Sequence, residues 1–253
     1  FGSAGTGLNA DVQLFGFNEG NGSTITSGAV STDLLLASDD IKINGVSVGT
    51  TDTDSAKDKA TAINAISAST NVTASASSVQ VITLTGTYTG TDDATINGVT
   101  VNMTGNSMLD DSVTSINTAM VAAGLDIVAT GDSDGNLVLT SLSGANIITN
   151  DGATGGLFGA VVDGQGTTIS AASNEFITRG KIALTSTDGS IIKLTDGSTT
   201  NAGLTKLGLT EQSEFSSAST TGLSVSSVAN ATASLTAIDS AITTVSEFRA
   251  SFG

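Results

Sequence analysis

The feature that most limits the fold of this chain is an internal duplication. Residues 40–48 read Asp-Ile-Lys-Ile-Asn-Gly-Val-Ser-Val, and residues 93–101 read Asp-Ala-Thr-Ile-Asn-Gly-Val-Thr-Val. The same offset of 53 residues joins three pairs of anchors, which are Ile43 and Ile96, Ile63 and Ile116, and Val72 and Leu125. A constant offset across three anchors indicates a repeated structural unit. The two units are predicted to cover about residues 38–86 and 91–142.

Each unit is predicted to be a helix packed on a hairpin. Isoleucine and valine alternate around Asn44-Gly45 and Asn97-Gly98, and Asn-Gly is the strongest short hairpin signal because both residues tolerate positive φ. A helix is expected from about Ser55 to Ala68, with Asp54 or Ser55 as its N-cap. Helical spacing is shown by Ala56, Ala60, Ile63 and Ile66 in the first unit, and by Val113, Ile116 and Met120 in the second. Strands at 79–84 and 137–139 are expected to close the units, which gives an α+β fold class.

The region from about 151 to 220 is predicted to be turn-rich β structure. Two apolar stretches, 180–185 and 191–194, flank Asp188-Gly189 and predict another hairpin. A short helix is expected around 202–207.

The last stretch differs in kind, because its apolar residues recur at steps of three and four. They are Val225, Val228, Ala231, Leu235, Ile238, Ile242, Val245, Phe248 and Phe252. This spacing predicts one long helix with a single apolar seam. A lone seam on a polar helix is not stable in water, so partner helices from elsewhere must cover it.

Composition excludes several classes of function. The 253 residues include no Cys and no His, which removes a Ser-His-Asp triad, a Cys nucleophile and a zinc site with His or Cys ligands. The net charge of −16 comes from 24 acidic and 8 scattered basic residues, and argues against nucleic acid or an anionic membrane as a partner. We expect no cofactor, no metal and no enzymatic activity.

Two acidic features have alternative interpretations. Asp132, Asp134 and Asn136 faintly resemble a calcium loop, but the spacing fails and a hairpin turn is the favoured interpretation. Paired acids occur at 39–40, 92–93 and 110–111, and helix capping or solvation accounts for them better than glycosidase chemistry does.

The terminal helix carries a family resemblance. The pattern Leu235-x-x-Ile238-Asp239-x-Ala241-Ile242-x-x-Val245-x-x-x-Arg249-Ala250-x-Phe252-Gly253 resembles the conserved C-terminal helix of bacterial flagellins over about thirty residues. The duplicated Ile-Asn-Gly-Val units are similar to a motif inserted in the variable region of flagellins and hook-associated proteins.

The resemblance implies a β-rich outer domain and a long C-terminal helix that belongs to a helical shaft domain. The implied divisions are an entry segment at 1–36, an outer domain at 37–150, the turn-rich region at 151–220 and a shaft helix at 221–253. Flagellin terminal helices that are expected on either side are missing, which suggests a truncated chain. The implied role is a secreted structural subunit of the extracellular flagellar filament, whose partners are copies of itself, hook-associated proteins and an export chaperone.

The implied interface lies on the terminal helix. Its residues are Val228, Leu235, Ile238, Asp239, Ile242, Val245, Arg249 and Phe252. The apolar members are expected to be buried against partner helices, whereas Asp239 and Arg249 form either interface pairs or a solvated helix face.

Other functions remain open at this point. A hook–filament junction or cap protein would share the insert motif and terminal helices. A surface adhesin or glycan-binding module would instead use the Thr-rich β units at about 37–220. If the protein is a flagellin, deletion of 38–149 is expected to leave filaments intact because the insert faces outward.

Overall fold

The computed structural model describes residues 18–20, 23–85, 93–103, 109–151, 157–171, 174–197 and 202–212. The chain divides into two compact units, Phe1–Glu211 and Gln212–Gly253. The predicted helix at 221–253 lies outside the described residues, so the fold described below is that of the first unit. In the described ranges, no helix is both long enough and apolar enough to cross a membrane.

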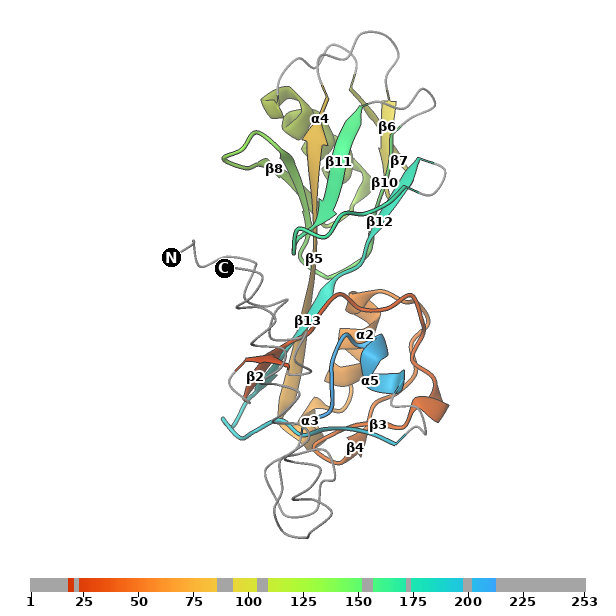
Figure 1. The fold of residues 1–253 in the computed structure, drawn as a ribbon, viewed down its shortest axis with the longest axis vertical. Coiled ribbons are helices and arrows are strands. Elements are labelled where there is room, and N and C mark those ends of the chain that lie inside the picture. Colours follow the sequence, from red (N-terminus) through yellow and green to blue (C-terminus); the bar gives the residue numbers. More distant parts are fainter. Residues whose placement is uncertain are drawn as a thin grey trace, which may run out of the picture. The chain divides into compact units, whose positions relative to one another are not determined.

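The described part of the first unit is an α+β structure in which antiparallel strands predominate (Figure 1). Its helices are η1 (Ala37–Asp39), α2 (Ala56–Asn64), α3 (Ser67–Thr70), α4 (Leu109–Ala123) and α5 (Ala202–Lys206). The strands of the first half are β1 (Glu19–Gly20), β2 (Thr24–Thr26), β3 (Ile41–Ile43), β4 (Val46–Ser47), β5 (Val72–Leu84), β6 (Asp93–Ile96) and β7 (Val99–Asn102). Those of the second half are β8 (Ile127–Gly131), β9 (Leu137–Ser141), β10 (Ile147–Asn150), β11 (Phe158–Asp163), β12 (Glu175–Thr178), β13 (Lys181–Ser186) and β14 (Leu194–Asp196).

Both predicted Asn-Gly hairpins are present. Strands β3 and β4 pair across one turn, and β6 and β7 pair across the other. The turn residues have positive φ, with 49° at Asn44, 84° at Gly45, 47° at Asn97 and 79° at Gly98. These values suit a two-residue hairpin turn, which needs residues that tolerate the left-handed region.

A third strand from later in the chain completes each hairpin, and the turn asparagine holds it. Strand β14 pairs with β3, and β10 pairs with β6. The Asn44 side chain accepts the Lys193 N–H at 2.8 Å and donates to the Thr70 carbonyl at 2.7 Å. Asn97 likewise accepts the Ile148 N–H at 2.7 Å and donates to the Asn146 carbonyl at 2.9 Å. We call this use of both amide atoms an asparagine bracket.

The helices of the two units also carry matching brackets. Asn64 of α2 exchanges two hydrogen bonds with the backbone of Ala74, at 2.7 and 2.8 Å. Asn117 of α4 does the same with Ala129, at 2.8 and 2.9 Å. Asn64 and Asn117 are also 53 residues apart, so the duplication extends to the two asparagines, whereas their partners Ala74 and Ala129 are 55 residues apart.

The predicted N-cap of the first helix is Ser55, whose hydroxyl accepts the Asp58 N–H at 3.2 Å. The helix is shorter than expected. It ends at Asn64, and α3 forms a separate turn that closes on Asn71 at φ 55°.

Strand β5 joins two hydrophobic cores (Figure 1). Its first half pairs with β13 and contributes Val72 to a core around α2, which we call the α2 core. Its second half pairs with β9 and β11 and contributes Ile82 to a core around α4, the α4 core. The expectation that 79–84 closes the first unit was therefore wrong, because these residues belong to the core of the second.

Each core draws on residues from both sides of position 150. The α2 core contains Ile25, Val30, Leu35, Ile41, Ile43, Ala56, Ile63, Val72, Ile182, Leu184, Ile192, Leu194, Leu204, Leu207 and Leu209. The α4 core contains Ile82, Ala94, Ile96, Val101, Met103, Ile116, Met120, Ile127, Ala129, Leu137, Leu139, Ile147, Leu157, Phe158 and Val161. A cut at 38 and 149 would remove strand β5 from both, so those deletion limits do not match the fold.

The predicted hairpin around Asp188-Gly189 was also wrong. Strand β13 pairs with β2 and β5, whereas β14 pairs with β3, so the two stretches belong to different sheets. Asp188 organises the connecting turn by accepting the Ser190 N–H at 2.9 Å and the Ser186 hydroxyl at 2.7 Å. Those bonds lower the pKa of the Asp188 carboxyl to about 2. The short helix predicted around 202–207 is confirmed as α5.

The helix bracket yields a first prediction. Asn117→Ala leaves the backbone N–H and carbonyl of Ala129 without their partner, and should lower the free energy of unfolding by about 1–3 kcal/mol in a urea titration. Thr118→Ala, at the neighbouring exposed residue of the same helix, is the matched control and should change it by less than about 0.5 kcal/mol. Equal effects of the two substitutions would contradict a special role for the bracket.

Candidate functional site

The site predicted from the sequence lies outside the described residues. This holds for Val228, Leu235, Ile238, Asp239, Ile242, Val245, Arg249 and Phe252. That interface therefore stays a prediction. The contacts described below are those within the first unit.

The Asp132 loop is a hairpin turn between β8 and β9, as the favoured interpretation held. The Asp132 carboxylate accepts the backbone N–H groups of Asp134 and Asn136 and the side-chain amide of Asn136, at 2.8 to 2.9 Å. The Asn136 amide is the main cause of a lowered pKa at Asp132. In the part of the chain that the structure describes, no group of three acidic side chains is placed to hold a metal ion.

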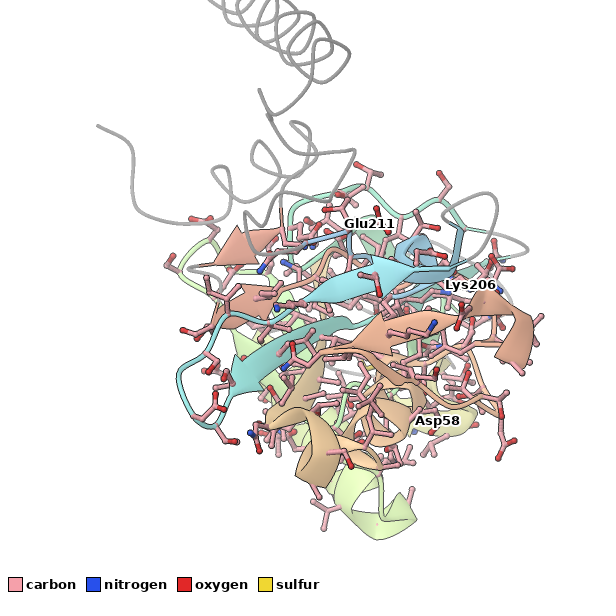
Figure 2. The ribbon with its side chains drawn as sticks, turned by 90° about the horizontal axis from the view of Figure 1, so that it is seen from below. Asp58, Lys206 and Glu211 are labelled. Atoms are coloured by element: carbon pink, nitrogen blue, oxygen red, sulfur yellow. The ribbon has the colours of Figure 1, made fainter. Side chains whose placement is uncertain are left out.

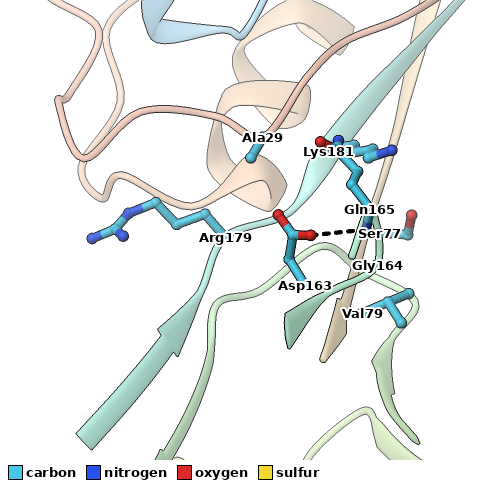
Figure 3. Close-up of a pocket in the computed structure, with 8 residues that line it drawn as sticks. All are labelled: Ala29, Ser77, Val79, Asp163, Gly164, Gln165, Arg179 and Lys181. Atoms are coloured by element: carbon cyan, nitrogen blue, oxygen red, sulfur yellow. Dashed lines mark hydrogen bonds between the residues drawn. The ribbon is translucent and has the colours of Figure 1, made fainter. Parts of the chain in front are cut away.

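A shallow hollow of about 170 Å³ lies beside β5 and β13 (Figure 3). It is lined by Ala29, Ser77, Val79, Asp163, Gly164, Gln165, Arg179 and Lys181. Asp163 uses one carboxylate oxygen to accept the Gln165 and Thr167 N–H groups, both at 2.8 Å. Arg179 is paired with Asp54 at 3.1 Å, and its side chain extends away from Lys181 in Figure 3. The charged groups that line the hollow therefore do not converge on a common ligand position.

The most distinctive contacts join the first and last described segments of the unit. We call residues 18–20 and 23–36 the entry segment, residues 202–211 the exit segment, and their contacts the seam. Asn18 donates from its side-chain amide to the Thr210 carbonyl at 2.8 Å, and its carbonyl oxygen accepts the Thr210 N–H at 2.8 Å. These residues are 192 positions apart, so the contact joins segments that are distant in the sequence.

Backbone hydrogen bonds continue the seam inward. The Gly28 N–H donates to the Gly208 carbonyl at 2.9 Å, and the Ser31 N–H donates to the Lys206 carbonyl at 3.1 Å. Gly208 has φ 67°, and a Cβ there would lie 2.7 Å from the Gly28 carbonyl oxygen. The approach of the two segments therefore needs glycine at this position.

A buried lysine fastens the seam from the interior. Lys59 of α2 is 0% exposed, and its ammonium donates to the carbonyls of Ser31 and Lys206, each at 2.9 Å. One carbonyl belongs to the entry segment and the other to the exit segment. Burial lowers the Lys59 pKa to about 8, against a partial opposing effect of Asp54 and Asp33.

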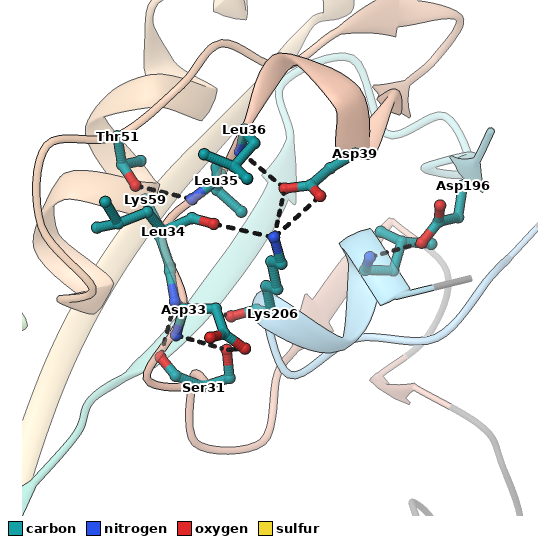
Figure 4. Close-up of polar contacts among 11 residues, drawn as sticks. Ser31, Asp33, Leu34, Leu35, Leu36, Asp39, Thr51, Lys59, Asp196 and Lys206 are labelled. Carbon is teal, nitrogen blue, oxygen red and sulfur yellow. Dashed lines mark hydrogen bonds and ion pairs between the residues drawn. The ribbon is translucent and has the colours of Figure 1, made fainter. Parts of the chain in front are cut away.

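A second lysine closes the outer part of the seam. Lys206 of α5 pairs with Asp39 of η1 at 2.9 Å and donates to the Leu34 carbonyl at 3.1 Å (Figure 4). Both side chains of this ion pair are largely buried, with 14% and 10% exposure. Asp39 also accepts the Leu36 N–H at 2.7 Å, so its carboxylate is satisfied on both sides.

The exit segment is fixed to β14 as well. The Asp196 carboxylate accepts the Leu204 N–H at 2.8 Å at the start of α5, and the Glu211 carboxylate accepts the Asp196 N–H at 3.0 Å. Lys206 and Glu211, labelled in Figure 2, thus bound a short segment that is held at several points.

The seam holds an anchoring arrangement rather than a reactive one. The charged groups of the seam form hydrogen bonds or ion pairs with backbone carbonyls, backbone N–H groups and one another. The arrangement holds the entry and exit segments side by side.

The sequence analysis missed the seam, although one signal was available. Lys59 falls on the same helical stripe as Ala56, Ala60 and Ile63, at the positions that face the core. A lysine on that stripe predicts a buried ammonium with backbone acceptors. No comparable signal identifies Asn18 or Thr210, since their contact spans nearly the whole unit.

Comparisons with known proteins do not assign the chain to a family. A scan against models of protein families gives no match, and a search among curated proteins gives none either.

The buried ammonium yields a second prediction. Lys59→Met removes the donor that two buried carbonyls share, and should lower the free energy of unfolding by about 2–4 kcal/mol. Lys57→Met, two positions earlier on the exposed side of the same helix, is the matched control and should stay within about 0.5 kcal/mol. A small cost for Lys59→Met, like that of the control, would show that the seam does not depend on this contact.

A third prediction concerns pH. The Lys59 pKa is about 8 in the folded chain and 10.5 in the unfolded reference, so between these values the unfolded state binds more protons. The wild-type protein should therefore gain stability relative to Lys59→Met as the pH rises from 7.5 to 10. Urea titrations of both proteins across this range measure the difference, in which other titrating groups cancel. A difference that stays flat or shrinks would contradict the burial of the charged amine.

Proposed function

We propose that this chain is a structural subunit of the bacterial flagellar filament, in which the first unit projects outward from a helical shaft. The terminal helix at 221–253 would belong to that shaft, and its partners would be other copies of the protein. Secretion, assembly with hook-associated proteins and a role in motility follow from this proposal.

The observation that carries the proposal is the contact between Asn18 and Thr210, which joins the first and last described segments of the first unit. A domain that projects from a scaffold needs entry and exit points that lie close together, so that the scaffold chain can continue almost uninterrupted. The apolar face predicted for the terminal helix, from Val225 to Phe252, also supports the proposal. It follows the first unit in the sequence, and it needs partner helices.

The acidic composition is consistent with this role. With a net charge of −16, subunits repel one another until specific helix contacts form, which favours solubility before assembly. Of the eight basic residues, Lys59, Arg179 and Lys206 are engaged in interior hydrogen bonds or ion pairs. A junction or cap protein would share these properties, and copy number per filament would distinguish it. The hollow beside β5 gives no specific support to a glycan-binding module.

The interface can be tested by charge placement on the terminal helix. Ile238→Asp with Ile242→Asp puts two carboxylates on the apolar face of the terminal helix. This variant should abolish filaments while the subunit is still exported. Ser240→Asp with Thr244→Asp is the matched control, because it adds the same charge at the same spacing on the opposite side of the helix. Electron microscopy of cell surfaces and immunoblots of the medium give the readout. Normal filaments in the variant with Ile238→Asp and Ile242→Asp would exclude the proposed interface.

A fifth prediction uses the limits of the unit. Residues 19–209 of the full-length protein are replaced by a short Gly-Ser linker. Filaments should remain intact, because the linker only has to connect Asn18 and Thr210, which are in contact in the fold. They should be thinner, because the outward unit is missing. Replacing only 38–149 should instead give misfolded subunits, since strands β13 and β14 lose β5 and β3. Loss of filaments with the first replacement, despite normal export, would count against an outward-projecting unit.

A further inference from the structure

Two Asn-Gly turns are held in the same unusual way. At Asn97, the side-chain oxygen accepts the Ile148 N–H at 2.7 Å and the side-chain nitrogen donates to the Asn146 carbonyl at 2.9 Å. At Asn44, the corresponding partners are the Lys193 N–H at 2.8 Å and the Thr70 carbonyl at 2.7 Å. Each side-chain amide is therefore directed at a neighbouring strand or turn and is satisfied at both ends.

Asn-Gly is also the dipeptide most open to intramolecular attack. The glycine nitrogen loses its proton and bonds to the asparagine side-chain carbon, the bond from that carbon to its amide nitrogen breaks, and ammonia leaves. The resulting succinimide is opened by a solvent water molecule at either carbonyl. The products are aspartate or isoaspartate, and no oxidant or reductant is required. Glycine favours the attack because it has no Cβ to obstruct the ring closure.

We propose that Asn97 and Asn44 are latent sites of spontaneous deamidation. In the folded unit, Asn97 is kept unreactive by β10 and the residues before it, and Asn44 by Lys193, which directly precedes β14, and by Thr70 of α3. Ring closure requires the side chain to turn back onto the peptide that follows it. In the fold, each of these side chains is hydrogen-bonded at both its oxygen and its nitrogen to other segments, so both hydrogen bonds must break before the nitrogen of Gly98 or Gly45 can reach it.

The reaction would be irreversible for the fold as well as for the residue. A carboxylate at 97 or 44 has no N–H to donate, and would face the carbonyl of Asn146 or Thr70 with a negative charge. Isoaspartate would also lengthen the main chain in a turn that is closed by two residues with positive φ. Deamidation would thus release the third strand from its hairpin and would mark an aged or once-unfolded molecule.

The wild-type chain provides a direct test. It contains a third Asn-Gly pair at Asn21-Gly22 for comparison within the same sample. The protein is incubated at mildly alkaline pH, once folded and once in urea, and peptide mapping by mass spectrometry follows the replacement of NH₂ by OH at each site. Deamidation at 44 and 97 should be roughly ten- to a hundredfold slower in the folded protein, as expected when two hydrogen bonds must open first. Equal rates in folded and unfolded protein would overturn the proposal.

A crossed pair of variants identifies the strands as the cause. Ile148→Pro removes the N–H that binds Asn97, and Lys193→Pro removes the N–H that binds Asn44. Each should accelerate deamidation only at its own asparagine, so the other site reports that the fold is intact. Lys193→Ala, which keeps the N–H, should leave both rates unchanged. If Ile148→Pro unfolds the chain, both rates rise together and the decision rests on Lys193→Pro at its exposed position. Unchanged rates at 44 in a folded Lys193→Pro protein would contradict the role assigned to the Lys193 N–H.

Discussion

The rest of the structure depends on the contact between the two ends of the unit. Strand β2 and the loop after it come from the entry segment, whereas α5 and the apolar residues Leu207 and Leu209 come from the exit segment. Both sets pack in the α2 core, and the Asn18 bracket, the Gly28 and Ser31 hydrogen bonds and the Lys59 ammonium link them directly. The buried ammonium costs desolvation, and two carbonyl acceptors offset part of that cost.

The duplication explains how two cores can share one chain. Each repeated unit supplies a hairpin, a helix and a strand, but neither supplies its own third hairpin strand. The first unit obtains β14 from far along the chain, and the second obtains β10 from just beyond its end. Strand β5 then serves the α2 core with one half and the α4 core with the other. The two cores are consequently linked through a shared strand, and a deletion that includes β5 removes residues from both of them.

The sequence predicts what local chemistry decides and misses what distant partners decide. Asn44-Gly45 and Asn97-Gly98 are identified because the positive φ they need is a property of those residues. Ser55 is identified as a cap for a similar reason. The stretches 180–185 and 191–194 have the alternation of paired strands, yet alternation does not name the partner, and each pairs elsewhere. The matching Asn64 and Asn117 stood in the repeat at the right offset, but nothing local shows that their side chains bind the following strand. The packing of Leu235, Ile238 and Ile242 remains a prediction, because those residues lie outside the described ones.

The central claim is that the entry and exit segments are held together in solution. The chain has no cysteine, so a labelled pair can be introduced without background. Ala29→Cys and Thr205→Cys lie on exposed residues on the two sides of the seam, and spin labels there report the distance across it by pulsed electron resonance. The account predicts one short and narrow distance distribution that broadens only when urea unfolds the protein. A broad distribution of long distances in the native protein would contradict it.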